Sequence, residues 1–356
     1  MNRKGDIPAL PELDSGKRLK RIKVPWNIDS RKQIRSGGYI GVSDASEVKL
    51  QRTRAGETAD FLMIVSPGEG EIAVGAIQTI LRSYPESRIW LRDDCTHDGT
   101  FERLQNVADA YPHRIDLVRN PAPMGYKGLP VSVFRSFDRI CRSGERLEMV
   151  IKLDPDVLLT GDEIVRFARS KFAEKGPGII GSYLLSAAKT RRNNTSFCIR
   201  FLLDLFPAGF DRHNKRFRFG LPFYAKYLPK AFRNGYLLGR HVMGAFYIVH
   251  GDTLRALNEV GFWRSIPDLG SREIKWDDAL VPIGPYFIGH KLIELHDHVE
   301  SRFWIQSKNP ISLSAEEIIA RRYQAVHPLK NDAAGSELRA RLAELAPHPP
   351  ASAASH

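Results

Sequence analysis

Asp154 and Asp156, two aspartates separated by a single proline, are the side chains of this sequence best suited to hold a metal ion. They follow the mostly apolar segment 148–153, which is typical of a strand buried on both faces of a parallel sheet. Pro155 has no N–H group to continue the sheet, so the strand is expected to end there. Open α/β sheets bind ligands at the carboxyl ends of their strands, and residues two apart in extended chain project to the same side. Both carboxylates can therefore face one hard cation such as Mg²⁺ or Mn²⁺, although a polar turn after a core strand has the same pattern.

Two further acidic groups lie at predicted element boundaries. The segment 92–100, RDDCTHDGT, offers Asp98 as an N-cap and Asp94 as a hydrogen-bond acceptor for a ligand above the sheet edge. As a capping turn it needs no function. Asp277 and Asp278 open a short helical pattern, a position that the helix dipole favours for carboxylates in any protein.

Regular alternation along the chain must position these groups. Apolar runs typical of buried strands alternate four times with apolar residues at helical spacing, which indicates a doubly wound, mostly parallel α/β sheet flanked by helices. The four expected strands cover residues 61–65, 88–91, 114–118 and 148–153. Weaker strand patterns lie at 179–185, 242–249 and 291–295. Ser314 and Glu317 form a capping-box pattern before a helix expected over 316–326.

Composition excludes several classes of protein. With 356 residues, of which 42% are hydrophobic and 26% charged, the chain has the make-up of a globular protein with one large or two smaller domains. No apolar run approaches the roughly 20 residues that span a bilayer, and the N-terminal segment lacks the apolar region of a secretory signal. The three cysteines are odd in number and widely spaced, which argues against a disulfide framework. These features predict a cytoplasmic protein.

The net charge of +12 is concentrated in one segment, residues 186–240, which holds twelve Lys and Arg against two Asp. The same segment contains eleven of the 29 Phe and Tyr residues. Such a basic, aromatic stretch is compatible with nucleic-acid contact, with docking on an anionic membrane surface, or with a solvated basic face over an ordinary core.

The acidic motifs together resemble a known family. The turn DDCTHDGT at 93–100 resembles the D-D-x-S/T-x-D-x-T turn of family 2 glycosyltransferases, the inverting enzymes of the GT-A fold. LDPD at 153–156 stands some sixty residues later, where that family carries its D-x-D motif. The resemblance covers roughly residues 59–300 and implies a GT-A-type sheet that binds a nucleotide sugar and a divalent cation.

The resemblance also implies roles for single residues. The acidic residues of the turn, Asp93 and Asp94, are expected to contact the nucleotide. Asp156 is expected to ligate the metal, and Asp154 to contact the metal or the ribose. Further contacts to the nucleotide sugar are expected from Ser66, Pro67, Gly125, Lys127 and Gly244.

The sequence WDDAL at 276–280 resembles the E-D-x-x-L element of the family, whose aspartate is the general base. We expect Asp278 to be the base and Asp277 to take the first acidic position, although Asp in place of Glu leaves the choice between them open. In many GT-A enzymes a late histidine completes the metal site. His296 or His298, which share one side of the chain after the last predicted strand, are expected to do so here.

The combined prediction is a metal-dependent inverting glycosyltransferase that uses Mn²⁺ or Mg²⁺. It would move a sugar from a nucleoside-diphosphate sugar, with a UDP-sugar favoured, to a hydroxyl of a glycan or lipid-linked acceptor, and the basic segment would dock on an anionic membrane. One alternative is a sugar-phosphate nucleotidyltransferase, but the loop 66–71 is acidic where a triphosphate needs cations. The other is a nucleic-acid-binding protein, against which the three acidic clusters stand.

The expected organisation has four parts. They are a basic extended arm (1–57), a nucleotide-sugar-binding half (58–180), a half with the acceptor site and the base (181–310, including the basic segment 186–240), and a C-terminal helix with a disordered tail (311–356).

Overall fold

The computed structural model describes residues 59–145, 147–192, 198, 215–266, 277–297, 302–306, 311, 313–330 and 332–345. The predicted arm 1–57, His298 and much of the basic segment 186–240 lie outside these ranges. Every described residue belongs to one compact unit, within residues 50–356.

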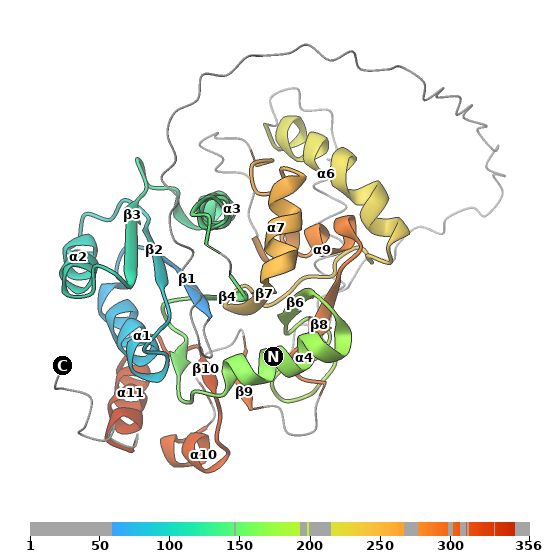
Figure 1. Ribbon diagram of the computed structural model, residues 1–356. Coiled ribbons are helices and arrows are strands. Elements are labelled where there is room, and N and C mark those ends of the chain that lie inside the picture. Colours follow the sequence, from blue (N-terminus) through green and yellow to red (C-terminus); the bar gives the residue numbers. More distant parts are fainter. Residues whose placement is uncertain are drawn as a thin grey trace, which may run out of the picture. The chain divides into compact units, whose positions relative to one another are not determined.

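Seven strands of the described residues form a central sheet in the order β3-β2-β1-β4-β7-β6-β8 (Figure 1). They are β1 (Asp60–Val65), β2 (Ile89–Asp93), β3 (Ile115–Arg119), β4 (Met149–Leu153), β6 (Gly178–Gly181), β7 (Phe246–His250) and β8 (Lys291–Glu294). β7 runs antiparallel to its neighbours β4 and β6, and the other pairs are parallel. The predicted α/β fold with a mostly parallel sheet is confirmed. Strands of this one sheet come from both of the chain segments predicted to form separate halves, 58–180 and 181–310.

Helices cover both faces of this sheet (Figure 1). One face packs against α1 (Gly70–Ser83), α2 (Thr100–Ala110) and α4 (Ile164–Lys175). The other packs against α3 (Gly125–Arg142), α6 (Lys215–Arg233), α7 (Gly251–Glu259) and α9 (Ile283–Ile288).

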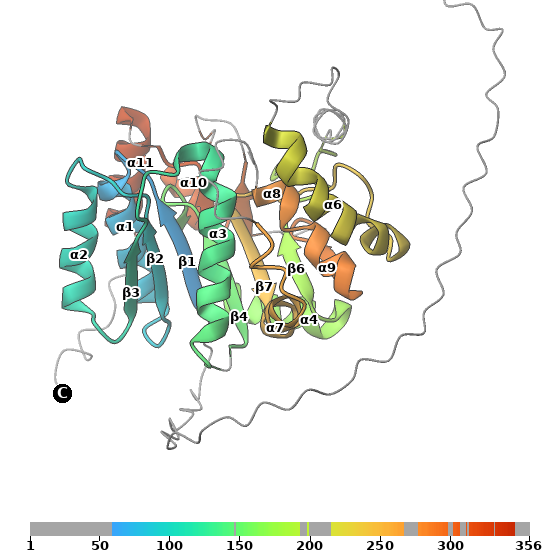
Figure 2. The ribbon, with the colours of Figure 1, turned by 90° about the horizontal axis from the view of Figure 1, so that it is seen from above.

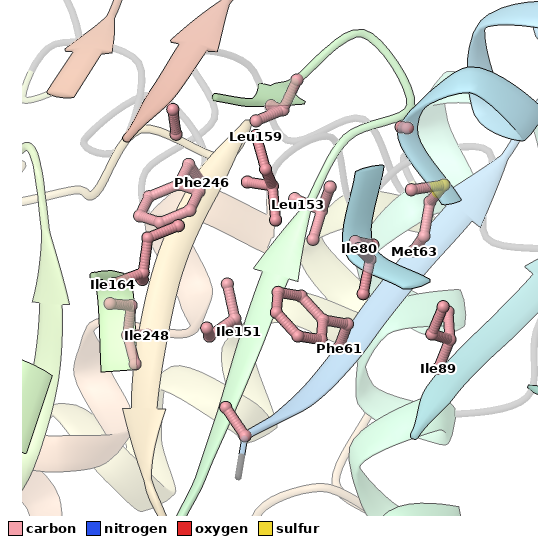
Figure 3. Packing of buried hydrophobic residues seen from close by; sticks show 14 of the residues in the cluster. Phe61, Met63, Ile80, Ile89, Ile151, Leu153, Leu159, Ile164, Phe246 and Ile248 are labelled. Atoms are coloured by element: carbon pink, nitrogen blue, oxygen red, sulfur yellow. The ribbon is translucent and has the colours of Figure 1, made fainter. Parts of the chain in front are cut away.

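Alternate residues of the central strands supply the two cores. Phe61 and Met63 of β1 belong to the cluster under α1, together with Ile151 of β4 (Figure 3). Leu62 and Ile64 belong to the cluster under α3. Because successive side chains of a strand point to opposite faces, a strand buried on both sides is mostly apolar along its length, as the sequence predicted.

A second, smaller sheet contains β5 (Leu158–Leu159), β10 (Ala325–His327) and β9 (Phe303–Ile305), in that order. It corrects the prediction of a helix over 316–326. The capping box of Ser314 and Glu317 is present, but the helix α10 (Ala315–Ala320) ends early and the chain continues into β10. Ala325 and Val326 are buried between β5 and β9, so the apolar run that suggested helix is a short core strand. A last helix, α11 (Ala333–Leu345), follows.

The carboxyl ends of the parallel strands carry the predicted motifs to one edge of the central sheet. Asp154 follows β4 and donates its backbone N–H to the carbonyl of Ala245, 2.9 Å away, in the loop before β7. In the same loop Val242 donates to the carbonyl of Asp278, on the four-residue helix α8 (Asp277–Leu280). In Figure 2, α8 lies at the carboxyl end of the parallel strands. The antiparallel course of β7 is what places its incoming loop beside the end of β4.

Candidate active site

Three side chains that suit a divalent cation converge after β4. Asp154, Asp156 and His327 each offer a ligand atom, and these atoms all lie within 4.8 Å of one another. His327 comes from the end of β10, and its Nε2 is 3.3 Å from Oδ1 of Asp156. The set mixes two carboxylates with an imidazole, which suits Mn²⁺ better than Mg²⁺, a cation that takes oxygen ligands.

The orientation of His327 favours metal binding. Its Nδ1 lies 2.6 Å from the backbone carbonyl of Gln306, and a carbonyl can only accept a hydrogen bond, so Nδ1 carries the proton. Nε2 therefore faces the Asp156 carboxylate, which is also an acceptor. Two acceptors at 3.3 Å require a proton or a cation between them. A backbone carbonyl behind a ligating imidazole is a common outer-shell arrangement in metal sites.

Asp156 is a buried carboxylate with basic neighbours. Its side chain is buried, its Oδ1 lies 3.3 Å from Nε2 of His327, and its Oδ2 forms an ion pair with Lys330, whose Nζ is 2.5 Å away. Burial alone would raise the pKa of Asp156, but hydrogen bonds and charge from His327 and Lys330 hold it well below the usual range. The backbone carbonyl of Asp156 also accepts from Leu329. The C-terminal segment is therefore part of this site.

Glu69 is an acidic residue of the site that sequence reasoning did not select. It lies in the loop after β1 and accepts a hydrogen bond from the backbone N–H of Ser66, 2.9 Å away. Burial and the negative charges of Asp154 and Asp156 together raise its pKa to about 7, although the Ser66 hydrogen bond opposes them. The acidic loop after the first strand was the available signal. Glu69 lies close enough to Asp154 and Asp156 for their charges to act on it, and Ser66 is held to Glu69 by the hydrogen bond.

The acidic turn after β2 is tied into the protein. The carboxylate of Asp93 accepts hydrogen bonds from the backbone N–H and the hydroxyl of Thr96, at 3.1 and 2.6 Å, and pairs with Arg119. Asp94 accepts from the backbone N–H groups of Met124 and Gly125, at 2.9 and 2.7 Å. Asp94 thus fixes the start of α3, including Gly125.

A contact of Asp93 or Asp94 with a nucleotide stays a prediction, since both carboxylates already have partners within the protein. Lys127 lies on α3, and its side chain is outside the described part of the structure.

The second acidic pair lies close to the loop before β7. A Cβ atom at Gly244 would lie 3.3 Å from Cβ of Asp278 and 3.6 Å from Oδ1 of Asp277, so a glycine allows this close approach. Asp277 is buried, and its Oδ2 has no hydrogen-bond partner among the described residues. Asp278 is half-buried.

Burial is the main cause that raises the pKa of both Asp277 and Asp278. The charge of Asp154 adds to the effect on Asp277, and that of Asp277 to the effect on Asp278, whereas the ammonium of Lys152 opposes both. A carboxylate with a raised pKa is a stronger base when ionised, which suits proton abstraction near neutral pH.

The expected late histidine is a different residue. The histidine that the structure brings to Asp154 and Asp156 is His327, and His296 is not a member of that group. His296 is buried after β8, and burial together with the positive charges of Lys189 and Arg192 lowers its pKa to about 4. His298 lies outside the described residues. A histidine does lie beside the two aspartates, and the pairing of β10 with β5 and β9 decides which histidine it is.

The basic segment is described only in part. Its helix α6 packs against α9 and buries aromatic residues such as Tyr227. Phe232 and Leu237 are exposed, with 45% and 58% of their surface accessible. No helix in the described ranges is both long and apolar enough to cross a bilayer.

No protein-family model and no curated protein matches the sequence. Among solved structures, the mannosyltransferase PcManGT from Pyrobaculum calidifontis, in complex with GDP-Man and Mn²⁺, is 13% identical to this chain, with a TM-score of 0.37. The matched region covers 66% of this chain and 55% of the mannosyltransferase chain. S. aureus TarS 1-349 in complex with UDP is 11% identical, with 67% and 58% covered and a TM-score of 0.35. The galactosyltransferase LgtC in complex with donor and acceptor sugar analogs is 12% identical, with 82% and 98% covered and a TM-score of 0.38.

The chain therefore spans less than two thirds of the length of the first two of these structures. At such identities and TM-scores, the similarity by itself decides neither the fold nor the activity. The fold follows from the sheet, and the activity must be argued from the site.

Proposed function

We propose that this protein is a metal-dependent glycosyltransferase that transfers a sugar, with inversion, from a nucleoside-diphosphate sugar to a hydroxyl group. One observation carries the proposal. Asp154, Asp156 and His327 offer ligand atoms within 4.8 Å of one another at the same sheet edge as Asp278, a carboxylate outside that group with a raised pKa. A glycosyl transfer with inversion needs both parts, a cation for the leaving diphosphate and a separate base for the acceptor.

The roles divide between the two acidic groups. Mn²⁺, when bound by Asp154, Asp156 and His327, supplies positive charge that stabilises the departing diphosphate. Lys330, whose ammonium lies beside Asp156 and is about half exposed, is placed to bind the donor phosphates. Its pKa is raised, mainly by the hydrogen bond and charge of Asp156 working against burial, so it stays cationic.

Asp278 fits the part of the base better than Asp277. Asp277 is buried and faces the ammonium of Lys152, and a base must reach solvent or an acceptor hydroxyl. Asp278 is more accessible and sits next to Gly244, where the absence of a side chain leaves room. Asp278 would take the proton of the acceptor hydroxyl as the sugar–oxygen bond forms.

Membership of family 2, a UDP-sugar donor, and a glycan or lipid-linked acceptor follow from the resemblance of the motifs and belong to this proposal. Two of the similar structures hold GDP-Man with Mn²⁺ and UDP. The basic segment, with six Lys or Arg and no Asp or Glu in α6, supports docking on an anionic membrane surface where a lipid-linked acceptor would be found. Glu69 disfavours the nucleotidyltransferase alternative, since it adds a carboxylate where a triphosphate would lie.

Thermal unfolding with nucleotides tests the donor site. UDP, GDP, ADP and a deoxythymidine diphosphate would each be added with and without Mn²⁺ to the wild type, to Asp156→Asn and to the control Asp116→Asn, which removes ion pairs on β3. A ligand at one hundred times its dissociation constant stabilises the fold by about 2.7 kcal/mol. We expect a Mn²⁺-dependent shift for one nucleotide that Asp156→Asn loses and the control keeps. No shift with any nucleotide would contradict the proposal.

A further inference from the structure

A lysine lies in the middle of the central sheet. Lys152 is the fourth residue of β4 and its side chain is fully buried. It pairs in register with Tyr247 of β7, and its Nζ is 5.8 Å from the centre of the Tyr247 ring. A charged group in such a position is strongly unfavourable unless it has partners, so its contacts explain its presence.

The ammonium of Lys152 joins segments that are far apart in the sequence. Its Nζ donates to Oδ1 of Asp154, one of the proposed metal ligands, and to the backbone carbonyl of Gly244 in the loop before β7. Burial would lower the pKa of Lys152, but the charges of Asp154, Asp277 and Asp278 raise it above its usual value. The lysine is therefore charged, and it serves carboxylates of both acidic groups.

Among the described residues, few cations other than Lys152 act on Asp277 and Asp278. The groups that act on Asp277 and Asp278 from neighbouring elements are Lys152 from β4, Asp154 after it, Arg192 from the segment after β6 and Tyr247 from β7. Arg192 acts on Asp278 but is not among the groups that act most strongly on Asp277. Gly244, whose carbonyl accepts from Lys152, lies against Asp277 and Asp278, so Lys152 links the metal side to the base side.

We propose that Lys152 is a positioning residue that holds Asp154 by one oxygen, leaving the other for the metal or ribose, and compensates the charge of the Asp277–Asp278 pair. The inference rests on the proposed function for the roles of the two acidic groups. The contacts of Lys152 with Asp154 and with the carbonyl of Gly244, a residue that lies against Asp277 and Asp278, are independent of it.

Metal-free stability tests the link directly. Lys152→Met keeps the length of the side chain and removes the charge. Lys171→Met is a matched control, because Lys171 on α4 is also buried and also forms an ion pair with one aspartate, Asp297. The melting temperatures of both variants and the wild type would be measured from pH 5.5 to 8.5 with a chelator present.

The expected deficit of Lys152→Met widens as pH rises, because ionising buried carboxylates without their cation becomes more costly. We expect the widening to be at least about 2 °C, the shift that corresponds to roughly 1 kcal/mol. The deficit of Lys171→Met should stay constant, since the Asp297 side chain is partly exposed and can be solvated. Parallel deficits for the two variants would overturn the inference.

If Lys152→Met does not fold, the double variant Lys152→Met/Asp277→Asn decides, because it removes one carboxylate along with the cation. A cooperative transition regained in the double variant supports the pairing, and its absence counts against it.

Activity gives the second readout. In Lys152→Met the acid limb of the kcat profile should move to higher pH, whereas Lys171→Met should keep the limb of the wild type. An unmoved limb would refute the positioning role. If the stability deficit of Lys152→Met widens with pH but the wild type has no transferase activity, the proposed function is contradicted and the electrostatic link stays intact.

Discussion

The choice of His327 over His296 as the metal ligand yields a sharp prediction. His327 is buried, its Nδ1 is held by Gln306, and its Nε2 points at Asp156. Replacing it by alanine removes one of three protein ligands. Loss of an outer-shell partner alone typically weakens metal affinity about 10- to 100-fold, so loss of the ligand should cost at least that, or about 1.4–2.8 kcal/mol.

Isothermal titration with Mn²⁺ would measure the dissociation constants of the wild type, His327→Ala and His296→Ala. Circular dichroism must show that both variants are folded, because His327 ends β10 and its loss also removes packing. We expect His327→Ala to bind Mn²⁺ at least about 10-fold more weakly and His296→Ala to bind it within about 2-fold of the wild type. The reverse order would refute the assignment of the ligand and restore the sequence-based choice.

Four further predictions concern the base, the glycine beside it, Glu69 and the C-terminal fold. Asp278→Asn should lower kcat by about 10²–10⁴ in a steady-state assay and leave nucleotide affinity unchanged. The control Asp252→Asn on α7 should change neither kcat nor nucleotide affinity. Gly244→Ala should lower kcat by more than its loss of folding stability explains, because the new Cβ would lie 3.3 Å from Cβ of Asp278. The pKa of Glu69 is raised from 4.5 to about 7, so the stability that its proton contributes is present below pH 4.5 and lost as pH rises through 7. Glu69→Gln should therefore raise the melting temperature more at pH 8 than at pH 5 in metal-free buffer. Ser314→Ala should cost about 1 kcal/mol in chemical denaturation, the usual loss for an N-cap.

Local patterns in the sequence predict the central sheet well. The apolar runs that became β1 to β4 and the helical spacing between them are short-range signals, and the burial of whole strands such as β1 follows directly from them. Pro155 also predicts correctly where β4 ends. The acidic pairs Asp154–Asp156 and Asp277–Asp278 could be chosen because a carboxylate at a strand or helix end is visible without the fold.

The missed residues depend on contacts between distant segments. His327 belongs to a three-residue strand that takes its structure from β5 and β9, and a run so short cannot be told from helix by periodicity. Lys152 is visible in the sequence as a single charged residue inside the apolar part of β4. Its meaning emerges only when the loop before β7 brings the carbonyl of Gly244 to it. In both cases a partner far along the chain, rather than the residue type, defines the role.

The most direct test of the central claim is the turnover of nucleotide sugars followed by nuclear magnetic resonance, with and without Mn²⁺, for the wild type and Asp156→Asn. The account predicts that one donor is cleaved only when Mn²⁺ is present, that Asp156→Asn loses this cleavage, and that the first sugar product has the inverted anomeric configuration. Cleavage that is equal in Asp156→Asn and independent of Mn²⁺, or no cleavage of any donor, would contradict it.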